Sequence, residues 1–536
     1  MHIAFLSNPA SGEVNVQLTT AEQLVAQGHA VTFLSAESCR SKVDRFRQSQ
    51  KHCDRDAIHF ISLGSGHTVD DVTPFIQKRM HLMRRVPGDP VSLQTCIECA
   101  LGPADEHAAT AIRVRDHLNA LDPDMICVDA LSPSCITGTR LTRRKFILTI
   151  PCSPGLSALP GAFDPHVVAW HRRGSLGTFF ENLYLSLSES IHSRTHPDRR
   201  EKHKIIKKLG LKSYGATRDS AHFPPHWSDD NCVAGIHFNT PGMIDCPKQS
   251  PKFVFVGAGV SEDLEPPPTT FPELEWMNEA AHLEHDVVYI NMGSMFIWES
   301  DEFEACVAGF KAAYRNLGGR VRFLVKMNGR PRRRSRGRSR HHATPNPGSN
   351  EKNLEFDDLA QLPPYIRLTS WIQNQQAVYT HPALKAFAHH GGGNSFNEAV
   401  HFAIPQLVLS QWLDTHEYGL YAEKFGLGLR SARPPHIEAD DIRFKIETLL
   451  GPKWDEFKSN CRAWSFRSQM AGGPAAAAKI VLFHAENEQK KYLAGRKRVS
   501  EASDSGLGSE LELTPPLSPV LEAKEEIEVK EIMIYS

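Results

Sequence analysis

Long apolar runs are missing from this chain, and so is any strong excess of charge. No apolar run approaches the roughly 18–20 residues that a helix needs to span a bilayer. The N-terminus, MHIAFLSNPASG, enters a short apolar run with no basic region before it, which predicts a first strand and not a signal peptide. These two observations lead us to expect a cytoplasmic protein without an integral membrane segment.

Charge and cysteine usage exclude further classes. The formal net charge is −1 over 536 residues, so no overall field draws the chain to nucleic acid or to an anionic membrane. The 11 cysteines are scattered. Only Cys96 and Cys99 form a CxxC pair, whereas a structural zinc site would need a second pair at a suitable spacing. We therefore expect reduced thiols and no metal.

Short apolar runs alternate with helical patterns through the first half of the chain. A helix is predicted from about Val14 to Gln27, and Gly28 suits its C-terminal cap. Strands are predicted at 2–8, 30–36, 58–63, 125–131 and 145–150. Nearly continuous apolar strands between helices indicate a parallel sheet that is covered on both faces.

The same pattern restarts at FVFVGAG (253–259), and the proline-rich segment 261–275 predicts an inter-domain linker. A helix is predicted over about 301–316, and strands at 287–293, 322–328, 365–371, 386–391 and 405–411. The α/β architecture is therefore two Rossmann-like domains with parallel sheets that face a cleft, at 1–250 and 251–487. We expect the last helix to pack back on the first domain, and ligands to bind outside the carboxyl ends of the strands.

Two segments do not fit this core. Residues 329–350 hold seven arginines between Arg330 and Arg340. This basic run lacks the interleaved aromatic residues of a single-strand binder, so a surface insertion is favoured and no nucleic-acid partner is expected. Residues 488–536 are rich in Glu, Ser and Pro, which predicts a disordered acidic tail.

The stretch HHGGGNSFNEAV (389–400) lies between a predicted strand and a predicted helix. A helix N-terminus offers free N–H groups and a positive dipole end to a phosphate, and glycine lets a ligand approach the backbone closely. Asn394 and Ser395 can cap the helix and donate hydrogen bonds. The carboxylate of Glu398 can accept the two hydroxyl protons of a ribose. The pattern therefore predicts a nucleotide site, because a plain capped helix would leave His390 and Glu398 unexplained.

The run from Trp371 to Asp414 resembles the donor-binding signature of the family 1 glycosyltransferases, UDP-sugar-dependent enzymes of the GT-B fold. The HxGxxNSxxE core of that signature is present as His390, Gly392, Asn394, Ser395 and Glu398. Fungal members without a membrane anchor resemble the chain most.

The resemblance implies an inverting hexosyltransferase. Its co-substrate would be a UDP-sugar, with UDP-glucose first, and it would use no further cofactor. The acceptor would be a hydroxyl of a lipophilic small molecule, such as a phenol, polyketide or sterol-like compound of secondary metabolism. The first domain would bind this acceptor and the second domain the donor.

The family's donor roles carry over to matching positions. Trp371 would stack on uracil, and Gln375 would read the edge of that base. The spacing from Trp371 to His381 is one residue longer than usual, so Asn374 or Gln376 could take the role of Gln375.

The remaining donor contacts go to the diphosphate, the ribose and the sugar. His390, Asn394 and Ser395 would hold the diphosphate, with Ser294 of VVYINMGSM beside it. Glu398 would bind the ribose and Asp414 the sugar hydroxyls. Thr415 stands where the family usually has Gln, which leaves the preference for glucose open.

The chain departs from the family at the catalytic base. Members carry a His after the first strand, and an Asp steadies it; here NPASGEVNVQL places Glu13 at the His position, and Asp129 of ICVDALS matches the Asp. An ordinary Glu has a pKa near ~4.3 against ~6.5 for His, although burial or repulsion from Asp129 could raise it. Three alternatives stay open: Glu13 is the base, His67 or a His within 166–171 is the base, or the chain binds a nucleotide sugar with weak or no transfer.

Two further features concern the acceptor and a rival function. Trp170, Phe179, Phe180 and Tyr184 follow one another at helical spacing and would line an apolar acceptor pocket or belong to the core. GAGVSE (257–262) resembles a dinucleotide-binding GxGxxG, but a Glu replaces the last Gly and three prolines follow shortly after it. An oxidoreductase is therefore disfavoured.

Overall fold

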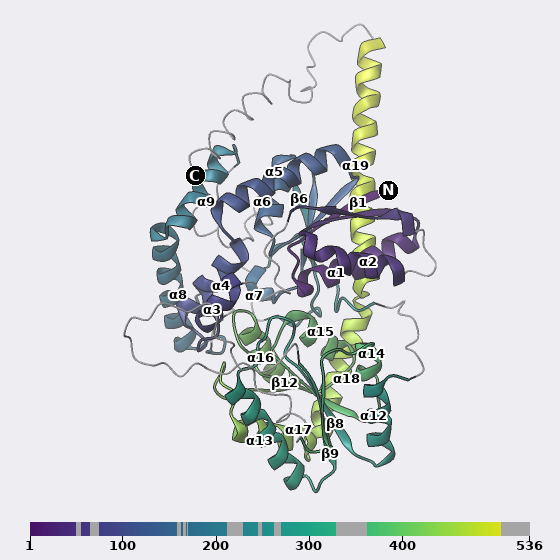
Figure 1. Cartoon of the computed structure of the whole chain (residues 1–536). Coiled ribbons are helices and arrows are strands. Elements are labelled where there is room, and N and C mark those ends of the chain that lie inside the picture. The colour runs from purple at the N-terminus through teal and green to yellow at the C-terminus, as the bar shows by residue number, and fades with distance from the viewer. Residues whose placement is uncertain are drawn as a thin grey trace, which may run out of the picture.

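Two α/β domains, one above the other in Figure 1, make up the computed structural model of the chain. The structure describes residues 1–49, 55–64, 74–157, 162–164, 168, 170–211, 229–244, 249–261, 270–327 and 362–504. The arginine-rich insertion at 329–350 and the alternative base His67 lie outside these residues, as does the chain after 504.

The first domain is built on a seven-stranded parallel sheet in the order β3-β2-β1-β4-β5-β6-β7. Its strands are β1 (His2–Leu6), β2 (Ala30–Ser35), β3 (Ile58–Ser62), β4 (Met125–Asp129), β5 (Phe146–Ile150), β6 (Cys232–His237) and β7 (Phe253–Phe255). The inner strands are buried along nearly their whole length, because helices cover both faces of the sheet.

The helices of this domain follow the strands in sequence. They are α1 (Ser11–Ala26), α2 (Arg40–Ser49), α3 (Pro74–Met83), α4 (Pro90–Leu101), α5 (Ala104–Leu121), α6 (Pro133–Leu141), α7 (Pro154–Ser157), α8 (Leu176–Thr195) and α9 (Pro197–Lys208), with 3-10 turns at Glu37–Cys39 and Arg55–Ala57. The apolar stripe of α1, which includes Val14, Leu18 and Leu24, packs on the sheet core. Gly28 follows the helix end with a φ of 82°, so the predicted cap is confirmed.

The second domain repeats the plan with six parallel strands in the order β10-β9-β8-β11-β12-β13. These are β8 (Asp286–Asn291), β9 (Val321–Lys326), β10 (Ile366–Thr369), β11 (Leu384–His389), β12 (Gln406–Val408) and β13 (Gly428–Arg430). The helices are α12 (Pro272–His282), α13 (Ser300–Asn316), α14 (Gln375–Tyr379), α15 (Gly393–His401), α16 (Thr415–Lys424), α17 (Ala439–Leu450), α18 (Trp454–Met470) and α19 (Gly473–Asp504). The order reverses direction between β8 and β11, which is where an open α/β sheet binds its ligand.

Two boundaries differ from the sequence prediction. β7 pairs with β6 at the edge of the first sheet, so the first domain continues past the predicted limit at residue 250. The sequence had suggested that the second domain starts at 253–259, because an apolar strand pattern restarts there after a proline-containing stretch. Helix α19 runs to Asp504, so residues 488–504 are helical and not part of a disordered tail.

The long helix α19 returns to the first domain, as Figure 1 shows in yellow beside β1. Its small residues Ala477, Ala478 and Ala485 join the core formed by α1 and the first sheet. The expected packing of the last helix on the first domain is thus present. In the described part of the chain, no helix combines the length and the hydropathy that crossing a bilayer requires.

Candidate functional site

The glycine-rich stretch forms the turn from β11 into α15, and it holds one histidine in place. A Cβ atom on Gly392 would lie 2.5 Å from His390 Nε2. A Cβ atom on Gly293, whose φ is 79°, would lie 2.6 Å from His390 Cε1. The imidazole is therefore enclosed by two positions that tolerate no side chain, one from each of the neighbouring strands β8 and β11.

His390 is neutral at physiological pH, because desolvation by the surrounding protein lowers its pKa to about 4. Its Nδ1 atom is buried and has no hydrogen-bond partner among the described residues. A buried polar atom without a partner is costly unless a ligand supplies one. Helix α15 starts at Gly393, three residues after His390, so its free N-terminal N–H groups and the histidine can bind the same anion.

Glu398 lies within a hydrogen-bond network one turn further along α15. Its Oε2 atom accepts from the Tyr379 hydroxyl at 2.8 Å and from Gln375 Nε2 at 3.1 Å. Gln375 Oε1 in turn accepts from Asn291 Nδ2 at 3.4 Å. Burial raises the pKa of Glu398 to about 7, with these hydrogen bonds and the charge of Lys326 opposing the rise.

This network distinguishes between Asn374, Gln375 and Gln376, the three candidates for the side-chain amide that would bind the edge of the nucleobase. Only Gln375 contacts Glu398. The Asn374 side chain accepts from the backbone N–H of Ala377 and caps α14, while Gln376 donates to the carbonyl of Ser261. The structure therefore places Gln375, and neither neighbour, beside the predicted ribose ligand.

Trp371 lies at the end of β10 with 61% of its surface exposed, which is unusual for so large a ring. Lys326 Nζ lies 5.1 Å from the ring centroid, and the guanidinium of Arg45 from α2 lies 5.9 Å from it. The indole thus has an accessible face in a basic environment, as a nucleobase next to phosphates requires.

The last predicted donor residues occupy different environments. Asp414 is partly exposed, accepts from the Ser153 backbone N–H at 3.0 Å, and has a pKa raised by burial to about 6. Thr415 is 1% exposed, and its hydroxyl is used within the turn, where it accepts from the backbone N–H groups of Gln411 and Trp412. Ser294 directly follows Gly293, the glycine that packs against His390, in the turn after β8.

The first domain contributes a pair of carboxyl groups. Asp129 ends β4 and is fully buried; its Oδ2 atom accepts from the Ser132 hydroxyl at 2.9 Å and from the Leu131 N–H at 2.8 Å. Burial raises the pKa of Asp129, and a hydrogen bond with Glu13 from the first turn of α1 opposes the rise. Two carboxyl groups in hydrogen-bond contact share one proton over a range of pH.

These carboxyl groups lie directly across the domain gap from the glycine-rich turn. Asn394 Nδ2 donates to the carbonyl of Gly12 at 3.2 Å. A Cβ atom on Gly393 would lie 2.2 Å from the carbonyl oxygen of Pro151. The N-termini of α1 and α15 therefore meet, and the residue next to Gly12 is Glu13.

The aromatic residues that the sequence suggested for the acceptor side lie in different environments. Phe180 is 63% exposed and Tyr184 is 57% exposed on the outer face of α8, so neither belongs to the core. Trp170 stacks on Arg430 at 4.0 Å. His171, one of the alternative bases, is exposed and lies 3.2 Å from Glu181 Oε2.

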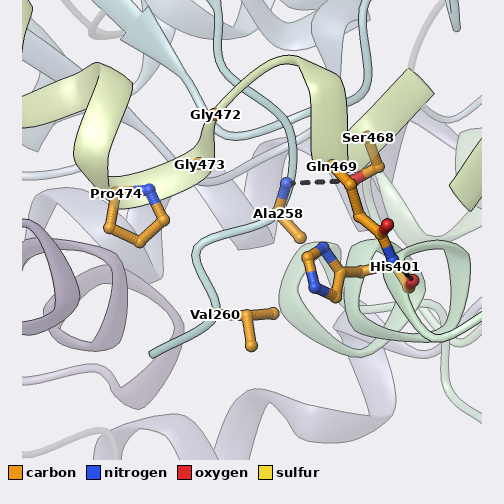
Figure 2. A pocket seen from close by; sticks show the side chains of 8 residues that line it. All are labelled: Ala258, Val260, His401, Ser468, Gln469, Gly472, Gly473 and Pro474. Atoms are coloured by element: carbon orange, nitrogen blue, oxygen red, sulfur yellow. Dashed lines mark hydrogen bonds between the residues drawn. The ribbon is translucent and has the colours of Figure 1, made fainter. Parts of the chain in front are cut away.

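A cavity of about 290 Å³ lies away from this chemistry. Figure 2 shows it where the connection at Ala258 and Val260 crosses the turn between α18 and α19. Its one titratable group is His401, which stands at the opposite end of α15 from the glycine-rich turn. The cavity thus belongs to the connection between the domains.

Among the residues that the structure describes, one group of side chains has the spacing of metal ligands. The ligating atoms of Glu98, His192 and His196 all lie within 4.8 Å of one another, between α4 and α8. The Glu98–His192 hydrogen bond of 2.7 Å already accounts for this proximity. Cys96 and Cys99 are free thiols, and burial raises the pKa of Cys99 to about 11.

Known proteins identify the family. The chain is 38% identical to erythritol-mannosyl-transferase 1 of Mycosarcoma maydis, over 94% of this chain and 95% of that protein. The chain belongs to the family 1 glycosyltransferases. Its residues 351–478 match the C-terminal domain of erythromycin biosynthesis protein CIII-like proteins. Glycosyltransferase sdnJ of Sordaria araneosa is 24% identical over 80% of this chain and 82% of its own.

Solved structures agree on the fold of this glycosyltransferase. The crystal structure of the glycotransferase of kitacinnamycin superposes with a TM-score of 0.59 at 15% identity, and covers 90% of this chain and 98% of its own. The predicted GT-B fold is confirmed. The enzyme transfers a hexose from a nucleotide sugar to a small-molecule acceptor, as members of its family do.

Several residues of the site are absent from the sequence prediction. Tyr379 and Asn291 complete the Glu398 network, and Ser153 binds Asp414 from the first domain. Tyr379 lies four residues after Gln375, a helical spacing that could have suggested it. Ser153 carries no comparable signal, because only the packing of the two domains brings it to Asp414.

Proposed function

We propose that this glycosyltransferase moves mannose from a nucleoside diphosphate to a hydroxyl of a short polyol. Two relatives that are both named erythritol-mannosyl-transferase 1 support the proposal, since each is 38% identical over at least nine tenths of this chain. The exposure of Phe180 and Tyr184 on α8 gives no support to a lipophilic acceptor in place of a polyol.

The observation that carries the proposal is the contact between Asn394 and Gly12. Because Glu13 follows Gly12, the contact supports a position of the Glu13–Asp129 pair near the N-terminus of α15, where a hydroxyl activated by the pair could reach the anomeric carbon. In the reaction, the hydroxyl oxygen bonds to that carbon while the bond from carbon to the diphosphate oxygen breaks, and the carboxyl pair takes the hydroxyl proton. The single displacement inverts the anomeric configuration.

The leaving diphosphate gains negative charge as its bond breaks. The N–H groups of α15 and neutral His390 stabilise that charge, while Asn394, Ser395 and Ser294 complete the set of donors. Glu398 holds the ribose and Asp414 the sugar hydroxyls. Thr415 adds no hydroxyl to the sugar contacts, because the turn uses it.

The family resemblance favours uridine, with UDP-glucose as the first candidate, whereas mannose is commonly carried on guanosine diphosphate. The exposed Trp371 accommodates either base, because stacking depends on ring area and not on edge hydrogen bonds.

The test is a matrix of donors and acceptors, read by mass spectrometry. UDP-glucose, UDP-galactose and GDP-mannose are each mixed with erythritol, mannitol and a panel of phenols. A mannosylated polyol supports the proposal. A glucosylated phenol would overturn both the mannose and the polyol assignment, and donor binding without product would identify a nucleotide-sugar-binding protein.

A further inference from the structure

Helix α8 presents an apolar stripe to solvent. Its large apolar residues are spaced by three or four positions, so they share one face, and each is roughly half exposed or more: Leu176 (71%), Phe180 (63%), Leu183 (47%), Tyr184 (57%), Leu187 (55%) and Ile191 (63%). Such a face is normally the buried side of a surface helix. Here Thr178, Leu185 and Ser193 are buried instead, against the rest of the domain.

The stripe continues at its N-terminal end into further aromatic side chains. Phe163, which is 46% exposed, lies 5.5 Å from Phe179, and Phe179 lies 5.3 Å from Phe180. Figure 1 shows α8 at the outer left edge of the first domain, away from the second sheet. A contiguous apolar surface of this kind on an outer helix marks an interaction site.

Exposed positive charges predominate around the stripe. Arg172 and Arg173 precede the helix and are exposed, although they pair with Glu423 and Asp164, and the exposed Arg194 and Arg200 follow the stripe at its other end. The two carboxylates within α8 are covered: Glu181 binds the backbone and side chain of His171, and Glu189 pairs with the buried Arg199. Helix α9 adds exposed Lys204, Lys207 and Lys208, and its carboxylates Asp198 and Glu201 pair with Lys202 and Lys204.

We propose that α8 lies on an anionic lipid surface, with its apolar stripe among the acyl chains and its arginines at the headgroups. A helix with an exposed apolar face, an aromatic residue with a polar tip and basic flanks has the chemistry of an interfacial helix. The net charge of −1 is no obstacle, because the relevant positive charge is local.

A second copy of the chain fits this face less well than lipid does. Pairing two α8 helices in either direction places arginines of one copy near arginines of the other. The described residues of this face offer no uncovered carboxylate on α8 to offset that repulsion. Anionic headgroups supply the missing negative charge.

The experiment is flotation of the full-length enzyme with vesicles of phosphatidylcholine, alone or mixed with phosphatidylserine. We expect binding to the mixed vesicles that weakens as salt rises. Leu187→Asp should lower the bound fraction by about tenfold or more, since it places a charge among acyl chains. The matched control is Phe444→Asp on α17, where the side chain is 56% exposed against 55% for Leu187, and this variant should bind as the parent does.

A second variant tests the charge. Arg194→Glu should reduce binding to the mixed vesicles and leave the melting temperature unchanged. No binding to either vesicle would overturn the proposal, as would equal losses for Leu187→Asp and Phe444→Asp. Light scattering that shows a dimer which Leu187→Asp dissociates would assign the face to a second copy of the chain instead.

Discussion

The side-chain amide of Asn394 donates to the backbone carbonyl of Gly12 across the two domains, at 3.2 Å. This contact joins the N-terminus of α15, the proposed donor helix, to the N-terminus of α1, which carries the proposed base Glu13. A transferase needs its nucleophile and its leaving group on opposite sides of one carbon atom. The contact between α1 and α15 is compatible with that geometry.

Glu13→Gln should lower kcat about 10²–10⁴-fold, because a general base of this kind contributes that range. Nucleotide diphosphate affinity, measured by calorimetry, should stay the same. The rate of the parent enzyme should fall as pH drops through the raised pKa of Asp129, since the pair accepts no proton once both carboxyl groups are protonated. Glu37→Gln, an exposed change in the same domain, is the control; a Glu13→Gln enzyme within threefold of the parent would assign the base elsewhere.

His390→Ala should weaken binding of a nucleoside diphosphate by about 1.5–3 kcal/mol, the usual loss for a hydrogen bond to a charged group. The effect on a nucleoside should be small, since that ligand has no phosphate to contact. Titration calorimetry with both ligands separates the two, and His436→Ala on the exposed surface is the matched control. Equal losses for both ligands would show that the change disturbs the whole site.

Gly293→Ala should reproduce part of the His390→Ala effect without touching the histidine. The added Cβ would lie 2.6 Å from His390 Cε1, so the imidazole must move. The φ of 79° adds backbone strain, and we expect a lower melting temperature as well. Gly12→Ala, where nothing lies within 4 Å of the new Cβ, serves as the comparison and should leave donor affinity unchanged.

Trp371→Ala should weaken binding of UDP or GDP by about 1–3 kcal/mol, the worth of one stacked base. Because the ring is exposed, stability should change little. Quenching of tryptophan emission on nucleotide binding, present in the parent, should disappear in the variant. Quenching that persists unchanged would place the base at a different site, and Phe466→Ala controls for loss of an exposed ring.

Glu417→Gln should flatten the dependence of stability on pH. Glu417 is buried between the domains, where it accepts hydrogen bonds from the hydroxyls of Ser153 and Tyr421, and burial raises its pKa to about 7. A carboxyl whose folded pKa is raised stabilises the fold below its ordinary value, and this contribution is lost as pH rises through the folded value.

The parent should therefore melt at a lower temperature at pH 8 than at pH 5.5, and this group should lower the free energy of unfolding by about 2 kcal/mol between these two values. The glutamine variant, which is neutral at both values, should lose most of that difference. The exposed change Glu304→Gln on α13 should preserve it. A variant with the pH dependence of the parent would show that other groups cause it.

Local patterns predicted most of the secondary structure and the donor site. The strands of both sheets are apolar because each is covered on two faces, so their positions follow from runs such as HIAFL and VVYIN. The donor residues from Trp371 to Asp414 are close in sequence, and one strand–turn–helix unit carries their core. Strand β6 was not predicted, since its run CVAGIH is short and follows a stretch with no periodic pattern.

The amino-acid sequence by itself determined the two α/β domains, the glycine-rich turn and the exchange of His for Glu13. Only the tertiary structure showed that Glu13 contacts Asp129. Asp129 lies 116 residues from Glu13, and their shared hydrogen bond arises because β1 and β4 are neighbours in the sheet. The apolar face of α8 was likewise decided by packing: helical spacing marks one face as apolar, but only the domain around the helix shows that this face points outward.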